Sequence, residues 1–255
     1  MGLLDGKKAL VFGVANNKSI AYAIARNFIE QGAEVAFSYA GEKLESRVAK
    51  VSEELGGKFL VPCDVTKDEE IEACFNTVKE KWGKFDILVH SVAYAPGDAL
   101  KDRYVDTKRA DFALAMDISV YSLPAIAKYA EPLMNEGGSV ICMSYLGAER
   151  VIKNYNVMGV AKAALEASTR YLAADLGINK IRVNAISAGP IKTLAAAGIS
   201  DFKKIFNHIA EHAPLHDNCT QEDVGRTAVY LASELSSAVT GEIIYVDNGY
   251  NIMGI

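Results

Sequence analysis

The chain has 255 residues, half of them apolar, and a net charge of −5 with a pI near 5.5. This is ordinary globular composition, and the acidic balance disfavours nucleic acid, which binds basic patches. The first residues lack a signal-peptide pattern, and we expect no run long enough to span a bilayer. These features predict a cytoplasmic protein that binds neither nucleic acid nor a membrane stably.

Apolar strand-like runs alternate with helical segments along the whole chain. They are rich in Val, Ile and Leu and barely alternate in polarity, as strands covered on both faces do. This order predicts one α/β domain over 1–255, a doubly wound Rossmann fold of about seven parallel strands with helices on both faces. Strands are expected at 7–13, 33–39, 58–64, 85–91, 137–144, 181–187 and 241–247, with the first two helices at 19–31 and 41–57.

The segment LVFGVANNKSIAYAIA after the first strand favours a dinucleotide site, although it has only Gly13 of the usual three glycines. A glycine permits a sharp turn, and the helix start that follows offers free amides to a pyrophosphate. Ser19 is placed to cap this helix and to present its hydroxyl to phosphate. For this segment alone, a loop without a ligand is the alternative.

The second strand ends in SYAGEK, with neither an acid nor an arginine at its tip. Lys43 and Arg47 follow on the helix, where we expect them to face solvent. Because no cation is placed for a 2′-phosphate, the sequence favours NADH over NADPH.

Three further strand ends carry residues suited to the same cofactor. Asp64 follows the third strand, where its carboxylate can accept from an adenine amino group or cap the next helix. Ser91 and Val92 follow the fourth strand and are small enough for a ribose or a flat ring to approach. Thr193, in SAGPIKTLA after the sixth strand, suits a turn beside nicotinamide and phosphate.

The segment 194–214 breaks the alternation and is amphipathic. Because it lies beside the predicted carboxyl ends of strands, we expect a small substrate lid, with a plain crossover helix as the alternative. The four cysteines and four histidines lack metal-ligand spacing. We therefore expect no metal site and reduced thiols.

The stretch YNVMGVAK places Tyr155 and Lys162 seven residues apart, two turns along one helix face. A phenol is a neutral donor at pH 7 and suits negative charge developing on a thioester oxygen. A nearby ammonium would hold ribose hydroxyls and lower the pKa of the phenol. Taken alone, the pair is more typical of a surface contact.

Together these motifs resemble the short-chain dehydrogenase/reductase superfamily and, within it, the bacterial NADH-dependent enoyl-acyl carrier protein reductases. The resemblance runs from GVANNKSIAYAIA through HSVAYAPGD, SYLGAER and YNVMGVAK to TGEIIYVDNGY, essentially the whole chain. Ordinary members have Tyr-x3-Lys, whereas the Tyr-x6-Lys of this chain is typical of the enoyl reductase branch. The resemblance implies reduction of the 2,3-double bond of trans-2-enoyl-acyl carrier protein thioesters with NADH, in type II fatty acid synthesis.

Carried over residue by residue, the resemblance implies that Tyr155 binds the enolate oxygen and Lys162 the ribose. It makes Tyr145 a catalytic residue that lines the acyl pocket. The other implied NADH contacts are Gly13, Ser19, Ile20, Asp64, Val65, Ser91, Val92, Ile191, Thr193, Leu194 and Ala195. The other implied substrate contacts are Ala95, Met158 and Ile199.

Two positions depart from the family pattern: many members have glutamine where Ala40 stands and glycine where Ala93 stands. The adenosine contact and the pocket floor are therefore expected to differ. The resemblance also implies a homotetramer. An acidic carrier protein would dock near the lid, where Lys203 and Lys204 offer positive charge, with a solvated helix face as the alternative for these two lysines. Two alternatives stay open. One is a ketone- or alcohol-directed short-chain dehydrogenase, with Ser144 as a rough counterpart of its serine, and the other is a non-catalytic NAD(H)-sensing protein.

Overall fold

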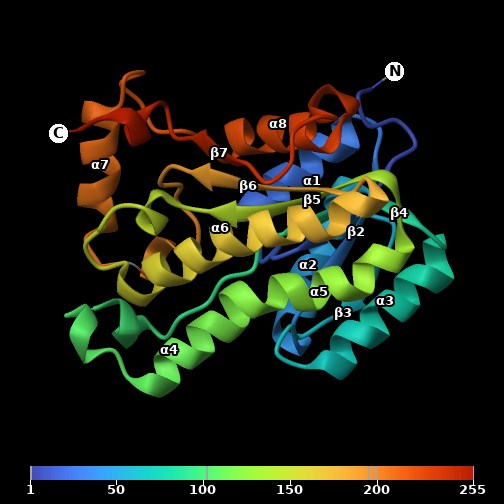
Figure 1. The fold of residues 1–255 in the computed structure, drawn as a ribbon, viewed down its shortest axis with the longest axis horizontal. Helices are drawn as coiled ribbons and strands as arrows, with labels where there is room; N and C mark the ends of the chain where they lie inside the picture. Colours follow the sequence, from blue (N-terminus) through green and yellow to red (C-terminus); the bar gives the residue numbers. More distant parts are fainter. Residues whose placement is uncertain (1, 102, 195, 199, 255) are drawn as a thin grey trace.

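The computed structural model describes residues 2–101, 103–194, 196–198 and 200–254. One sheet of seven parallel strands runs through these residues in the order β3-β2-β1-β4-β5-β6-β7, which confirms the predicted doubly wound fold (Figure 1). The strand order reverses between β1 and β4, where ligands of such sheets bind. The strands are β1 Lys8–Phe12, β2 Glu34–Tyr39, β3 Leu60–Pro62, β4 Phe85–His90, β5 Met134–Ser144, β6 Arg182–Ala188 and β7 Ile243–Val246.

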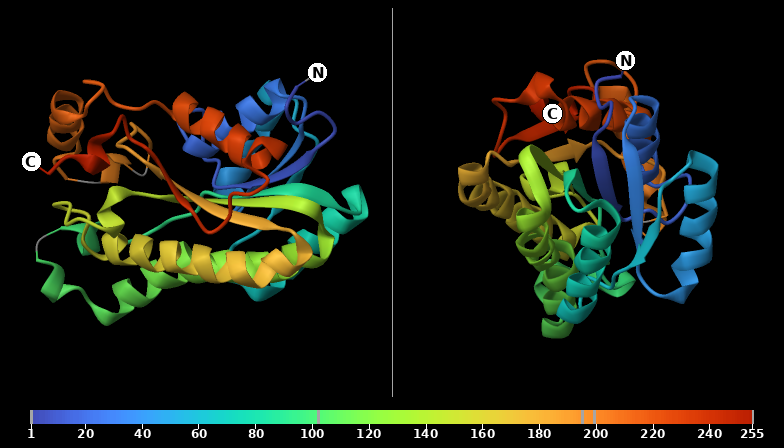
Figure 2. Two further views of the ribbon diagram at one scale, coloured as in Figure 1. Left: turned by 45° about the horizontal axis from the view of Figure 1, so that its top comes forward. Right: turned by 90° about the vertical axis from the view of Figure 1, so that its right-hand side faces the viewer.

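Helices cover both faces of the sheet (Figure 2). One face packs against α1 (Ile20–Glu30), α2 (Glu42–Leu55) and α8 (Gln221–Ala232). The other packs against α3 (Asp68–Trp82), α5 (Ser122–Ala130) and α6 (Asn156–Leu176). Consecutive residues of β1 enter opposite cores, which explains why the strands show so little alternation. Short 3-10 turns lie at Gly97–Leu100, Tyr104–Asp106, Glu131–Leu133, Leu146–Ala148, Gly177–Asn179, Ala196–Gly198, Glu234–Ser236 and Tyr250–Ile252.

Helix α4 (Arg109–Met116) continues through a π-helical turn, Asp117–Tyr121, into α5. The helical run Arg109–Leu133 is long and apolar enough to cross a bilayer by length and composition, and 44% of its most apolar window is buried. The expectation that no run reaches this length was therefore wrong. An apolar helix that is only half buried leaves one face to be covered, which bears on subunit assembly below.

The predicted lid segment contains the 3-10 turn Ala196–Gly198 and helix α7 (Phe202–His212). Helix α7 stands apart from the sheet, at its carboxyl edge (Figure 1). Within α7 only Ile209 is buried. A contact of this kind holds a helix weakly, as expected of an element that moves when a ligand binds.

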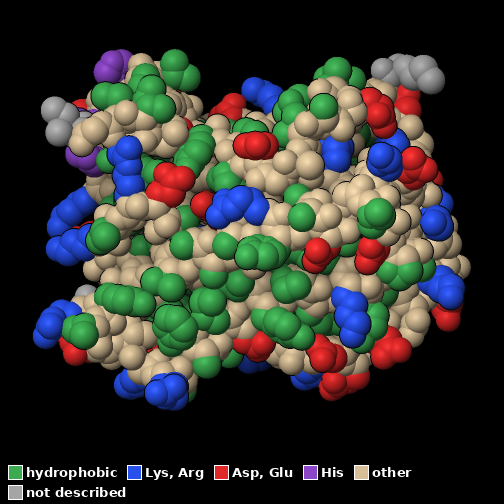
Figure 3. All heavy atoms as spheres, in the orientation of Figure 1, with side chains coloured by type: hydrophobic (Ala, Val, Ile, Leu, Met, Phe, Trp, Pro, Cys, Tyr) green, Lys and Arg blue, Asp and Glu red, His purple; other side chains and the backbone are tan. Residues whose placement is uncertain are grey.

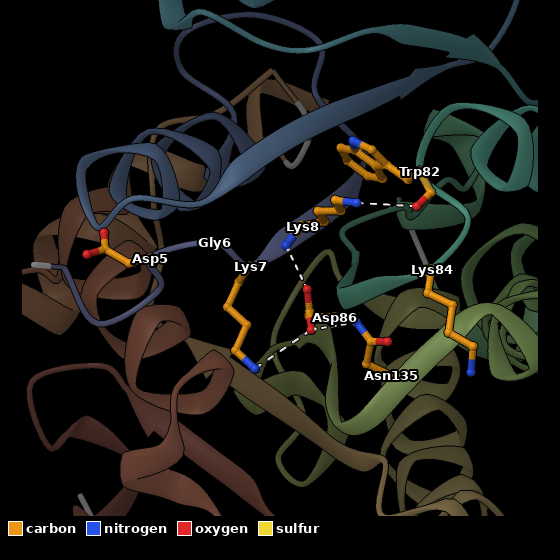
Figure 4. A pocket seen from close by; sticks show the side chains of 8 residues that line it. All are labelled: Asp5, Gly6, Lys7, Lys8, Trp82, Lys84, Asp86 and Asn135. Atoms are coloured by element: carbon orange, nitrogen blue, oxygen red, sulfur yellow. Dashed lines mark hydrogen bonds and ion pairs between the residues drawn. The ribbon is translucent and has the colours of Figure 1, made fainter.

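The opposite, amino edge of the sheet is held by a buried carboxylate (Figure 4). Asp86, on β4, accepts hydrogen bonds from the Lys8 backbone amide and the Asn135 side chain, both at 2.9 Å. The Lys7 ammonium lies 3.7 Å away. These residues line a pocket of about 470 Å³ whose lysines diverge, as Figure 4 shows. This end of the sheet therefore carries a structural contact between β1, β4 and β5.

Replacing Asp86 by alanine should lower the free energy of unfolding by about 1–3 kcal/mol, because two donors lose their acceptor. Reaction rates and NADH affinity should not change, since Asp86 lies at the end of the sheet away from the cofactor site. Urea unfolding measures the first effect, with Glu34→Ala in a surface ion pair (3.4 Å from Lys58) as the control. Equal stabilities of the two variants would contradict this reading of Asp86.

Candidate active site and cofactor site

The ends of β1 and β4 approach each other closely at the point where the strand order reverses. The Ser91 amide donates to the Phe12 carbonyl at 3.2 Å. Gly13 has a φ of 97°, and a Cβ there would lie 2.1 Å from the Ser91 carbonyl oxygen. Only glycine fits at position 13, so the backbones at the ends of β1 and β4 lie in close contact. We call this surface the Gly13 cradle. Val92, next along, is partly buried against the core.

Helix α1 begins beside this cradle, with Ser19 at its N-cap and Ile20 as its first residue. The first turn of α1, all of it described, carries no acidic side chain, so no side-chain charge there repels an anion from the positive end of the helix dipole. Ser19 does not cap the helix as predicted. Its hydroxyl oxygen instead accepts from the Ala15 and Asn16 amides at 3.0 and 3.2 Å and so holds the loop. Its own proton can still be donated to phosphate.

At the end of β3, Asp64 forms the local turn that the sequence left as an alternative. Its carboxylate accepts from the Thr66 amide and hydroxyl at 3.1 and 2.8 Å. Partial burial raises the pKa of Asp64, but the Thr66 hydrogen bonds and Lys67 outweigh it and hold that pKa below its usual value. Asp64 is therefore a charged acceptor, beside the buried Val65. Both residues border the predicted adenine site.

The segment after β6 folds back on itself. The Thr193 amide donates to the Ile191 carbonyl at 2.8 Å, and the Thr193 hydroxyl accepts from the Ala196 amide at 3.1 Å. Leu194 is half exposed. Two predicted contacts, Ala195 and Ile199, lie outside the described residues.

Four predicted substrate residues lie in one apolar cluster: Ala95, Tyr145, Tyr155 and Met158 pack together beside α6. The rings of Tyr145 and Tyr155 meet edge to face, with centroids 4.9 Å apart. Two phenols thus sit among aliphatic side chains, an arrangement that suits a ligand with an apolar chain and one polar atom.

Two glycines that the sequence interpretation did not single out fix the Tyr155 ring. A Cβ on Gly147 would lie 2.4 Å from that ring, and a Cβ on Gly159 would lie 2.7 Å from the Gly147 carbonyl oxygen. Position 159 is where a Tyr-x3-Lys sequence places its lysine. Here there is no room for any side chain, so the lysine must come later in the helix.

Tyr155 is a firmly neutral phenol, contrary to the predicted effect of Lys162. Burial raises its pKa, and the neighbouring Tyr145 raises it further. Burial also raises the pKa of Tyr145 to about 12. The predicted lowering was wrong because desolvation dominates and the Lys162 ammonium is engaged elsewhere. Tyr155 also stands just before α6, at its N-cap, and not within the helix.

Lys162 is buried on α6, and its ammonium donates to the Met143 carbonyl of β5 at 2.7 Å. Burial lowers its pKa to about 8, although Cys142 and Glu166 act in the opposite direction. An ammonium has three donors, and this hydrogen bond uses one of them. The remaining donors suit vicinal hydroxyls of a ribose.

His90, at the end of β4, is a buried neighbour of Lys162 that the sequence did not assign to the site. Burial and the Lys162 charge lower its pKa to about 3, so it is neutral. Its Nε2 lies 2.7 Å from the Ser122 hydroxyl, which itself donates to the Ile118 carbonyl at 2.6 Å. His90 must therefore donate through Nε2. Its Nδ1 has no hydrogen-bond partner among the described residues.

A model of the enoyl-(acyl carrier protein) reductase family matches residues 13–251. The enoyl-acyl-carrier-protein reductase (NADH) FabI of Rickettsia felis is 56% identical over 253 residues, 99% of this chain and 97% of that protein. The crystal structure of the Bacillus cereus enoyl-acyl carrier protein reductase with NADP+ and indole naphthyridinone covers 100% of both chains at 54% identity, with a TM-score of 0.98. This chain belongs to the enoyl-(acyl carrier protein) reductase family.

One solved relative carries the predicted cofactor. The reductase of Anaplasma phagocytophilum, solved in complex with NAD, is 49% identical with a TM-score of 0.95 and covers 100% of this chain and 95% of its own. In this enoyl reductase the Gly13 cradle and the uncapped start of α1 fit a dinucleotide. Lys43 and Arg47 are exposed at the β2 end, as predicted.

The hydrogen bonding of Ser144 favours an enoyl reductase over a ketone-directed short-chain dehydrogenase. Its hydroxyl donates to the buried Glu166 carboxylate at 2.5 Å and is not available to a substrate. Glu166 lies one turn beyond Lys162 on α6, a position that could have been noticed from the i+4 spacing. Ser144, the counterpart of the serine in a ketone-directed dehydrogenase, therefore already donates its hydroxyl proton to Glu166.

NADH binding should depend on the charge of Lys162. Because its pKa is about 8, the ammonium predominates below that pH and is lost above it. The dissociation constant for NADH should be constant from about pH 6 to 7.5 and rise several-fold by about pH 9.5, as charge-assisted hydrogen bonds to the ribose are lost. Calorimetric titration measures it, and Lys162→Met should give weak binding without this transition. A flat wild-type profile would refute the assignment.

Proposed function

We propose that this enoyl reductase uses NADH to reduce the 2,3-double bond of trans-2-enoyl-acyl carrier protein thioesters, the last step of type II fatty acid elongation. The observation that carries the proposal is the neutral, buried Tyr155 in an apolar cluster at the N-cap of α6, with the buried Lys162 ammonium on that helix. A sensor protein would not need a phenol held in this way by two glycines.

The protein residues act on the thioester and on the position of the reactants. NADH, when bound, supplies a hydride to the β-carbon. Tyr155 donates a hydrogen bond to the thioester oxygen, where negative charge develops, and its apolar surroundings strengthen that bond. Tyr145 packs against Tyr155 and keeps its ring in place. Lys162 holds ribose hydroxyls, so that the transferable hydride faces the β-carbon.

The acyl chain would lie along Ala95 and Met158, and the segment 194–214 would close over it as the lid of a single catalytic domain. Lys203 and Lys204 are exposed on α7. The Lys204 ammonium pairs with Asp201 at 2.9 Å, and the adjacent Lys203 adds an exposed positive charge to α7. An acidic carrier protein would be drawn to this face when it delivers its thioester.

We further propose a cytoplasmic homotetramer. Apolar side chains gather over α6 and the α4–α5 run (Figure 3). On α6, Val160 and Tyr171 lie eleven residues apart on one face, and Tyr121 is half exposed on the π-helical turn. A contiguous apolar face of this size indicates a protein contact. A subunit contact there also explains how the apolar helical run Arg109–Leu133 can be only half buried within one chain.

Tyr171→Glu should dissociate the assembly, because a carboxylate would be buried at the subunit contact. Light scattering after gel filtration should give the wild type four times the 27.5 kDa chain mass and the variant a smaller mass. Ile178→Glu, at an exposed position in the turn after α6, should leave the mass unchanged. A monomeric wild type would contradict the proposal.

Crotonyl thioester should oxidise NADH faster than NADPH in the presence of the enzyme, and a ketoacyl thioester should oxidise neither. Tyr155→Phe should lower the turnover number about a hundredfold, because the donor to the developing oxyanion is lost. Tyr129→Phe, a tyrosine stacked on Phe75 in the core, is the matched control. Oxidation with the ketone alone, or a Tyr155→Phe variant as fast as wild type, would refute the mechanism.

A further inference from the structure

The two residues that flank Tyr155 both have left-handed backbone conformations. Asn154 has a φ of 63° and Asn156 a φ of 34°, whereas Tyr155 between them has a φ of −109°. Non-glycine residues rarely adopt positive φ, and asparagine does so at the lowest cost. Two such residues around one functional side chain show that the backbone is held in an unusual shape there.

Asn154 is bonded to the start of α7. Its side-chain amide donates to the Ser200 carbonyl at 2.9 Å. The pKa of the neighbouring Asp201 carboxylate is lowered mainly by Lys204, with smaller contributions from Lys153 and Asn154. The residue just before Tyr155 is therefore joined to the segment that leads into α7.

Asn156 is bonded to a turn that packs in the acyl cluster. Its side-chain amide donates to the Lys101 carbonyl at 3.0 Å. Lys101 ends the 3-10 turn Gly97–Leu100. Leu100 of that turn packs in the same apolar cluster as Tyr155 and Met158. Asn154 thus contacts the proposed lid segment, and Asn156 contacts a turn of the acyl cluster.

We propose that Asn154 and Asn156 are positioning residues that place the Tyr155 hydroxyl for catalysis by tying the backbone on its two sides to the segment before α7 and to the turn that ends at Lys101. This inference rests on the proposed function. The two hydrogen bonds, at 2.9 and 3.0 Å, fix the backbone on each side of Tyr155. Asparagine suits both positions because it combines an amide donor with tolerance of positive φ.

Glycine substitutions separate these two properties. Asn154→Gly and Asn156→Gly keep the left-handed backbone and remove the amide, whereas alanine at either position disturbs both. Asn154→Asp keeps the shape but replaces the donor by an acceptor. Both glycine variants and Asn154→Asp should lower the turnover number with crotonyl thioester about tenfold, while the NADH dissociation constant stays within about twofold of wild type.

Asn248→Gly is the matched control. Asn248 also has a positive φ, 57°, and its amide donates to the Asp217 carbonyl at 2.9 Å. Its turnover number should equal that of wild type. Full activity in the two glycine variants would overturn the inference, and so would a loss of turnover accompanied by equal losses of NADH affinity and melting temperature. If wild type itself does not reduce crotonyl thioester, the proposed function fails as well.

Discussion

One buried ammonium constrains the geometry of the whole site. Burying a charge is costly unless partners are supplied, and for Lys162 these are the Met143 carbonyl and the nearby Glu166. The bond to Met143 joins α6 to the carboxyl end of β5. Because Tyr145 comes two residues after Met143, and Tyr155 immediately before α6, both phenols are placed by the same contact.

The spacing between tyrosine and lysine follows from steric limits at position 159. The Gly147 carbonyl occupies the space that a side chain at Gly159 would need. The glycine lets the 147–155 loop pack closely on the helix, and the same loop supplies the surface that holds the Tyr155 ring. A longer tyrosine–lysine spacing and a tightly held phenol are thus two results of one close backbone contact.

The fold could be predicted from sequence because every strand is a short apolar run bounded by helical segments. The clustering of Tyr145, Tyr155 and Met158 was predicted from family resemblance, not from periodicity. Contacts between distant elements escaped prediction: Ser144 with Glu166, Asn154 with Ser200, and His90 with Ser122. The sign of the Tyr155 pKa shift was also wrong, since sequence shows which charges are near in the chain and not how deeply a group is buried.

The position to which hydride is transferred tests the central claim most directly. The enzyme should be given crotonyl thioester with NADH deuterated on one face of the nicotinamide and, in a second reaction, on the other face. The product of each reaction is then analysed by NMR. Deuterium at the β-carbon of a butyryl thioester is the expected result. A product without deuterium at its β-carbon from either form of NADH would contradict the account.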